Sequence, residues 1–95
     1  MMSQTYYLIR SKADGQYLVA RPNQDAADAG YVLMFREQYD ALSYLNTHGK
    51  NVSDRFGIES IPATQMKALL DRWGFTGIGM VSDPLVPQID FLTHR

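Results

Sequence analysis

Residues 61–82, IPATQMKALLDRWGFTGIGMVS, contain one complete helix and the strand that follows it. Four apolar side chains recur at the spacing of a single helix face: Met66, Leu69, Leu70 and Trp73. Pro62 suits the first turn of this helix, and Gly74 supplies the left-handed residue with which helices commonly end. Residues 76–82 then continue as a strand. An amphipathic helix that leads into an apolar strand predicts a domain in which helices pack on a sheet.

Residues 5–47 predict three more strands and a second helix. Strand-forming residues flank Asp14-Gly15, which indicates a β-hairpin over residues 5–21 with a two-residue turn of the primed type. Residues 31–35 form a short apolar strand, and a helix is expected from residue 36 to about residue 47. The buried stripe of that helix is expected to be Ala41, Leu42 and Leu45.

Two further strands complete the prediction. Phe56 and Ile58 alternate with Gly57 and Glu59, and residues 88–93 alternate in the same way after the turn at Asp83-Pro84. The predicted fold class is therefore α+β, a small mixed sheet with the order β-β-β-α-β-α-β-β and both helices packed on one face. Because 95 residues match the usual size of one domain, we predict a single domain over residues 1–95.

Composition excludes several classes of function. The sequence contains no cysteine, which removes disulfides, thiolate catalysis and cysteine-bound zinc, and favours a cytoplasmic location. No apolar run approaches the length of a membrane helix, and no secretion signal is expected, so we predict no membrane association. Nine basic against ten acidic side chains give a net charge of -1, which disfavours a nucleic-acid partner.

Residues for catalysis or cofactor binding are not evident. Gly77 and Gly79 follow a helix and open a strand, the reverse of the order in a dinucleotide-binding loop. We therefore expect these glycines to allow a close approach of the backbone to a neighbouring helix or to bend the strand. The acidic residues are scattered over turns and outer helix faces, without the spacing of a carboxylate pair or a calcium loop. We predict no catalytic residue, no cofactor and no metal site.

The absence of such chemistry favours a protein-interaction or regulatory module. Tyrosine and arginine are enriched where partner proteins dock, and the first helix places two tyrosines on the rims of its buried stripe. The predicted partner-binding residues are Arg36, Tyr39 and Tyr44. The partner is expected to be another protein of unknown identity. A homodimer is also plausible, because the hairpin or the last strand would lie at an open sheet edge.

Two alternative functions stay open. A small-molecule site or minor enzyme would use the loop at residues 48–55, where four polar side chains are grouped: His48, Lys50, Asp54 and Arg55. The competing structural explanation for His48 is a histidine at a helix C-terminus, where the helix dipole favours its positive form. A single-stranded nucleic-acid binder would use the hairpin face, with Tyr6, Tyr7, Tyr17, Arg10, Lys12 and Arg21.

Roughly half of the chain resembles a known family. The strand and helix around residues 35–45, and the stretch from Ile61 through Trp73 to Ser82-Asp83-Pro84, are similar to the N-terminal domain of the SseB family. That family has an Asn-Pro turn where this chain has Asp83-Pro84. The resemblance implies a small α+β domain without known catalytic residues, used in regulatory or secretion-related protein contacts.

Overall fold

The computed structural model describes residues 4–22, 29–49, 51 and 53–94. Its strands are β1 (Thr5–Ser11), β2 (Val19–Ala20), β3 (Tyr31–Phe35), β4 (Phe56–Pro62), β5 (Gly77–Asp83) and β6 (Gln88–Thr93). Its helices are α1 (Gln38–His48) and α2 (Met66–Trp73), and short 3₁₀ turns over residues 53–55 and 63–65 precede β4 and α2. The predicted order of strands and helices is confirmed.

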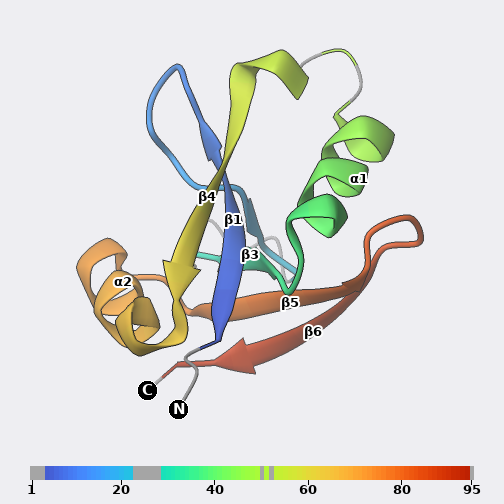
Figure 1. Cartoon of the computed structure of the whole chain (residues 1–95). Coiled ribbons are helices and arrows are strands. Elements are labelled where there is room, and N and C mark those ends of the chain that lie inside the picture. The colour runs from blue at the N-terminus through green and yellow to red at the C-terminus, as the bar shows by residue number, and fades with distance from the viewer. Residues whose placement is uncertain (1–3, 23–28, 50, 52, 95) are drawn as a thin grey trace.

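The strands form one mixed sheet in the order β4-β1-β3-β5-β6, with β2 paired to β3 beside β1 (Figure 1). The pairing of β3 with β5 is parallel, and the other pairings are antiparallel. The predicted α+β class is therefore confirmed. The sheet order places β4 at one edge and β6 at the other.

The two helices lie on opposite faces of this sheet, so the prediction that both pack on one face is wrong (Figure 1). Leu70 of α2 packs in a cluster with Leu8, Val32, Met34, Ile61 and Met80. Ala41 and Leu45 of α1 pack in a second cluster with Ile9, Leu33, Phe35 and Val81. Neighbouring residues of a strand point to opposite faces, which is why consecutive residues of β1 and β3 divide between the two clusters.

Helix α1 buries a narrower stripe than its sequence predicts. Ala41 and Leu45 are buried, but the side chain of Leu42 is 47% exposed. The helix lies over β1 and β3, and Leu42 faces away from them toward the edge of the sheet at β4. The prediction that Leu42 is buried is therefore wrong.

The hairpin is shorter than predicted, and its turn is longer. Ser11 exchanges backbone hydrogen bonds with Gln16 and Gly15, which closes a loop of residues 12–15 in place of a two-residue turn. Gly15 has the expected positive φ, 72°. After Tyr17 bridges to Arg10, the chain leaves β1, and β2 pairs with β3. Strand β3 pairs with β1 over only two residues, so the rest of this edge of β3 is free to pair with β2.

Helix α2 ends as the sequence predicts. Gly74 is left-handed, with φ 69°, and the amide of Phe75 donates to the carbonyl of Leu70 over 3.1 Å. The end of β6 is fixed to the same region, because the amide of His94 donates to the carbonyl of Thr76 over 2.8 Å. The His94 ring also lies 2.7 Å from a carboxylate oxygen of Asp71, and this hydrogen bond lowers the pKa of Asp71.

Candidate functional site

The outer edge of β4 has backbone groups that its own sheet leaves unpaired. At the two ends of the β1–β4 pairing, Lys12 donates to the carbonyl of Arg55 and Ala63 donates to that of Gln4, each over 2.8 Å. Antiparallel residues alternate between facing their partner strand and facing away, so residues 57, 59 and 61 face β1. Phe56, Ile58 and Ser60 therefore direct N–H and C=O groups outward, where no strand of the described chain pairs with them.

A hollow flanks this edge on each face of the sheet. We call the first the α1 hollow; it has a volume of about 390 Å³ and is lined from α1 and β4, with one residue of the preceding turn: Gln38, Leu42, Leu45, Asn46, Asp54, Phe56 and Ile58. We call the second the α2 hollow; it has a volume of about 380 Å³ and is lined by Tyr17, Glu59, Ser60, Ile61, Gln65, Ala68, Leu69 and Arg72. The open backbone of β4 thus runs between two recesses, each backed by a helix.

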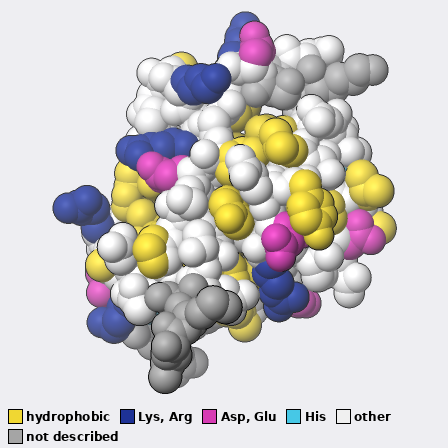
Figure 2. Space-filling view, viewed as in Figure 1, with side chains coloured by type: hydrophobic (Ala, Val, Ile, Leu, Met, Phe, Trp, Pro, Cys, Tyr) yellow, Lys and Arg dark blue, Asp and Glu magenta, His cyan; other side chains and the backbone are white. Residues whose placement is uncertain are grey.

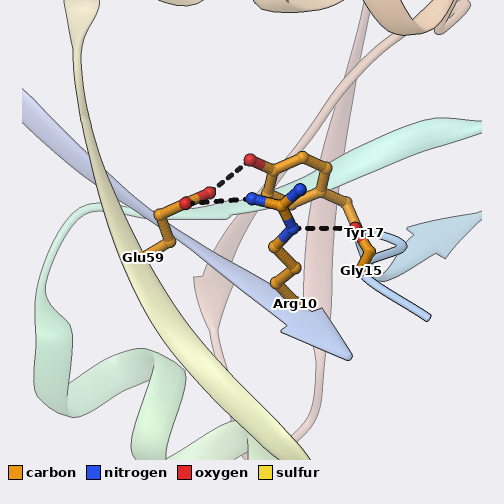
Figure 3. A network of polar contacts seen from close by, with 4 residues as sticks. All are labelled: Arg10, Gly15, Tyr17 and Glu59. Atoms are coloured by element: carbon orange, nitrogen blue, oxygen red, sulfur yellow. Dashed lines mark hydrogen bonds and ion pairs between the residues drawn. The ribbon is translucent and has the colours of Figure 1, made fainter. Parts of the chain in front are cut away.

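A polar network forms one wall of the α2 hollow (Figure 3). One carboxylate oxygen of Glu59 accepts a hydrogen bond from the Arg10 guanidinium over 3.2 Å, and the other accepts the Tyr17 hydroxyl. Arg10 also donates through Nε to the carbonyl of Gly15 over 2.7 Å. The network ties the hairpin loop to β4, so the wall of the hollow is fixed from two directions.

The network controls the protonation of Tyr17. Burial raises the pKa of this phenol from 10.0, and the hydrogen bond and negative charge of Glu59 raise it further, to about 12. The positive charge of Arg10 acts in the opposite direction but is outweighed. Tyr17 is therefore a neutral hydrogen-bond donor at every physiological pH.

The aromatic rings of Trp73 and Phe75 pack against Tyr17. Trp73 meets the Tyr17 ring edge to face with centroids 5.0 Å apart, and Trp73 stacks on Phe75 at 5.9 Å. The guanidinium of Arg10 lies 4.8 Å from the Tyr17 centroid and 5.7 Å from that of Trp73. The hairpin face thus uses Arg10 and Tyr17 for internal contacts.

The two adjacent tyrosines of the hairpin face do not form one platform. Tyr6 packs against the α2-side cluster and Tyr7 against the α1-side cluster, as expected for adjacent strand residues. In the view of Figure 2, basic and acidic side chains are interspersed among exposed hydrophobic ones, and neither sign dominates. No contact among the described residues favours the nucleic-acid alternative.

The predicted partner-binding residues differ in their surroundings. Arg36 is exposed before α1, and Tyr39 is 65% exposed in the first turn of the helix, next to Gln38 of the α1 hollow. Tyr44 is half-buried, with its ring 5.5 Å from Phe35 and 4.7 Å from His48, and burial raises its pKa. Tyr39 is thus available to a partner, whereas the ring of Tyr44 is engaged in packing.

The predicted ligand loop is divided by the structure. His48 is the last residue of α1, and its Nε2 lies 2.9 Å from the carbonyl oxygen of Pro84, in the turn between β5 and β6. Asp54 is exposed and lines the α1 hollow, and Arg55 is exposed in the 3₁₀ turn before β4. Lys50 lies outside the described residues. His48 is directed toward the carbonyl of Pro84 in the β5–β6 turn, whereas Asp54 lines the α1 hollow, so these two described residues point to different parts of the molecule.

The open edge of β4 and its network are the features that sequence reasoning missed. Arg10 and Glu59 carry opposite charges on two strands, but their contact follows from the pairing of Arg10 beside Gly57, which only the sheet order specifies. In the sequence Glu59 looks like an ordinary polar residue of an alternating strand. The structure shows it partly buried, where a carboxylate requires a cation or donor nearby.

Among the described residues, His, Asp and Glu form no group of three that could hold a metal ion. None of the helices in the described part of the chain is long and apolar enough to cross a membrane. No protein-family model matches this chain, and neither the curated proteins nor the solved structures include a significant match.

Proposed function

We propose that this chain is a protein-interaction module that binds an extended segment of a partner protein as an additional strand on β4. The open backbone of β4 between two helix-backed hollows is the observation on which the proposal rests. Strand addition uses the unpaired N–H and C=O groups for affinity and recesses beside the edge for side-chain specificity. Phe56, Ile58 and Ser60 provide the backbone groups.

The two hollows fit alternate side chains of such a segment. Successive side chains of an added strand point to opposite faces, so one set would enter the α1 hollow and the other the α2 hollow. The α1 hollow offers apolar contact to Leu42, Leu45 and Phe56, with the exposed Tyr39 close to its rim. The α2 hollow combines the apolar Leu69 with the exposed cation of Arg72. We expect the partner to carry an apolar side chain on the first face and an acidic one on the second.

The resemblance to the SseB family N-terminal domain is part of this proposal, because it implies regulatory or secretion-related protein contacts. The cytoplasmic location that the lack of cysteine favours belongs to the same proposal. Arg36 and Tyr39, predicted as partner-binding residues, precede or begin α1 and would contact the partner beyond the strand itself.

A selection of random peptides on immobilised protein tests the proposal. Proline at position 60 removes one outward N–H and leaves the bonds to β1 intact, because Ser60 is exposed and faces away from β1. Peptides selected by the wild-type protein should lose binding to Ser60→Pro at least tenfold and bind Ser60→Thr, which keeps the N–H, with unchanged affinity. Circular dichroism of both variants checks that the sheet is retained.

Side-chain recognition is tested with the same peptides. Leu42→Asp in the α1 hollow should weaken binding, and Arg72→Glu should reverse any preference for acidic peptides. Equal binding of one peptide by wild type and by folded Ser60→Pro would overturn strand addition on β4.

A further inference from the structure

The geometry points to a second interface: β6 pairs with β6 of a second copy of this chain, antiparallel and with Phe91 opposite Phe91, so that two sheets join into one. This surface is separate from the proposed site on β4, because the sheet order places β4 and β6 at opposite edges.

The first observation is the concentration of exposed apolar side chains at this edge. The large hydrophobic residues that are exposed in the described chain are Tyr39, Leu42, Leu85, Val86, Phe91 and Leu92. All but the first two belong to β6 or to the turn that precedes it. Phe91 is 40% exposed and Leu92 is 55% exposed on the two faces of the same edge strand.

The second observation is that β6 lacks the usual protection of an edge strand. Natural edges are commonly protected by several charged side chains, above all lysine, by proline or by a bulge within the strand. The sequence of β6, QIDFLT, contains no lysine and no proline, and Asp90 is its single charged residue. The register irregularity of this hairpin lies in β5, between Val81 and Asp83. The edge is therefore open to another strand.

The third observation identifies the backbone groups on this edge. His94 donates to the carbonyl of Thr76 over 2.8 Å, and a Cβ at Gly77 would overlap the carbonyl oxygen of Leu92. Both contacts show that the even-numbered residues at this end of the chain turn their backbone toward β5. By the antiparallel alternation, Ile89, Phe91 and Thr93 direct their N–H and C=O groups away from the sheet.

These outward groups select one register between two copies. With Phe91 opposite Phe91, Ile89 also stands opposite Thr93 of the second copy, so every outward residue of β6 enters a hydrogen-bonded pair. Moving the register by two residues in either direction leaves an outward residue of β6 without a partner in the other β6. One such shift also places Asp90 directly opposite Asp90, where like charges repel.

Side-chain contacts favour the same arrangement. The ring of Phe91 lies on the α1 face, 5.1 Å from the ring of Tyr31, and would meet Phe91 of the second copy on that face. Aromatic cross-strand pairs stabilise sheets. On the other face, Leu92 would cover the carbon atoms of Asp90 from the second copy. A second copy therefore complements this strand in backbone and in side chains.

Two variants that introduce opposite charges at residue 91 test both the dimer and its register. The wild-type protein should sediment as a dimer that dissociates on dilution. Phe91→Lys and Phe91→Glu should each be monomeric, because residue 91 would face its own copy, and an equimolar mixture of the two should form a heterodimer. The control Leu92→Lys, on the other face and opposite Asp90, should remain dimeric.

Disulfide trapping gives a second measurement, since the chain has no cysteine of its own. Hydrogen-bonded antiparallel neighbours have Cα atoms about 5.5 Å apart, within the range that a disulfide spans. Phe91→Cys should therefore form a disulfide-linked dimer under mild oxidation. Thr93→Cys is a matched control, because the two copies of residue 93 would be separated by roughly 13 Å along the strands.

Two results would overturn the inference. One is a wild-type protein that stays monomeric at all concentrations, in which case the edge accepts a strand of another protein or none. The other is a dimer that persists in both Phe91→Lys and Phe91→Glu, or that is trapped by Thr93→Cys in preference to Phe91→Cys.

Discussion

At the scale of single residues, Tyr17 connects three parts of the structure. Its hydroxyl is bonded to Glu59 on β4, and its ring meets Trp73 at the end of α2. It also follows the hairpin loop, whose Gly15 carbonyl is held by Arg10. One side chain therefore links the hairpin, the β4 edge and α2.

The raised pKa of Tyr17 predicts a loss of stability at alkaline pH. In the unfolded chain this phenol ionises near pH 10.0, whereas in the folded protein it keeps its proton to about pH 12. The folded state therefore holds more protons between these values, and the free energy of unfolding falls as pH rises through this interval. Below pH 10 the raised pKa of Tyr17 contributes its full amount to the free energy of unfolding.

Urea denaturation at a series of alkaline pH values measures this effect. Tyr17→Phe should show a smaller decrease of unfolding free energy than the wild type between pH 10 and pH 12. Tyr31→Phe is a suitable control, since it removes an exposed hydroxyl that contacts only Thr93 among the hydrogen bonds described. Identical pH profiles for the wild type and Tyr17→Phe would contradict the assignment.

At the scale of elements, the β5–β6 pairing depends on glycine. A Cβ at Gly77 would overlap the Leu92 carbonyl and lie 2.9 Å from Cα of Thr93, both of which are backbone atoms that cannot move aside. The sequence predicted that Gly77 and Gly79 let the backbone approach a neighbouring helix or bend the strand. At Gly77 the closely approaching backbone is that of strand β6, not of a helix. A Cβ at Gly79 would meet side chains of Leu33 and Ile89.

Replacing two glycines with alanine separates the steric overlap between β5 and β6 from the strain of a positive φ. Gly77→Ala should cost about 4 kcal/mol or more, because the two strands must separate. Gly74→Ala should cost only about 1–2 kcal/mol, since its Cβ meets no atom within 4 Å and the strain comes from φ 69° alone. Urea unfolding at neutral pH gives both values, and equal costs would rule out the close approach as the cause.

The sequence predicted most elements because their signals are local. The helix face at Met66, Leu70 and Trp73, the stop at Gly74 and the strand over residues 88–93 each depend on a few neighbouring residues. The position of α1 depends on the whole sheet. Residues 32–35 are all buried, and a strand buried on both faces reads as an unbroken apolar run. That run, VLMF, was the available signal that helices cover both faces.

The candidate sites were less accessible to prediction. The open backbone of Ser60 and of Phe91 follows from the strand order, which brings residues far apart in sequence together and is not encoded in any one segment. The tyrosine pattern of α1 placed Tyr39 and Tyr44 alike on the rims of the buried stripe, and Tyr39 is 65% exposed. It could not distinguish Tyr39 from Tyr44, whose ring packs on Phe35 of the strand before the helix.

At the scale of the whole molecule, two hydrophobic clusters share one set of strands. Each cluster is covered by one helix, through Leu45 of α1 and Leu70 of α2, and both include residues of β1, β3 and β5. Since the same strands support both clusters, neither face of the sheet is complete without the other. We therefore expect the chain to unfold as one cooperative unit.

Shortening one buried side chain on each helix tests whether the two faces of the sheet unfold together. Leu45→Ala and Leu70→Ala, at residues 6% and 4% exposed, should each lower the free energy of unfolding by about 2–5 kcal/mol. Both should retain a single transition followed by fluorescence and by circular dichroism. Leu42→Ala, on the exposed side of α1, should change stability by at most about 0.5 kcal/mol. Two separate transitions in either buried variant would show that the faces unfold independently.

The parallel pairing of β3 with β5 also determines when the protein can fold during its synthesis. The segment between these strands contains α1, β4 and α2, so β3 leaves the ribosome long before its neighbour in the sheet. Until β5 emerges, the apolar residues 32–35 have no strand on that side. Contacts between residues so distant in sequence slow folding, because a long loop must close before they form. The core of this protein can therefore assemble only after β5 has left the ribosome.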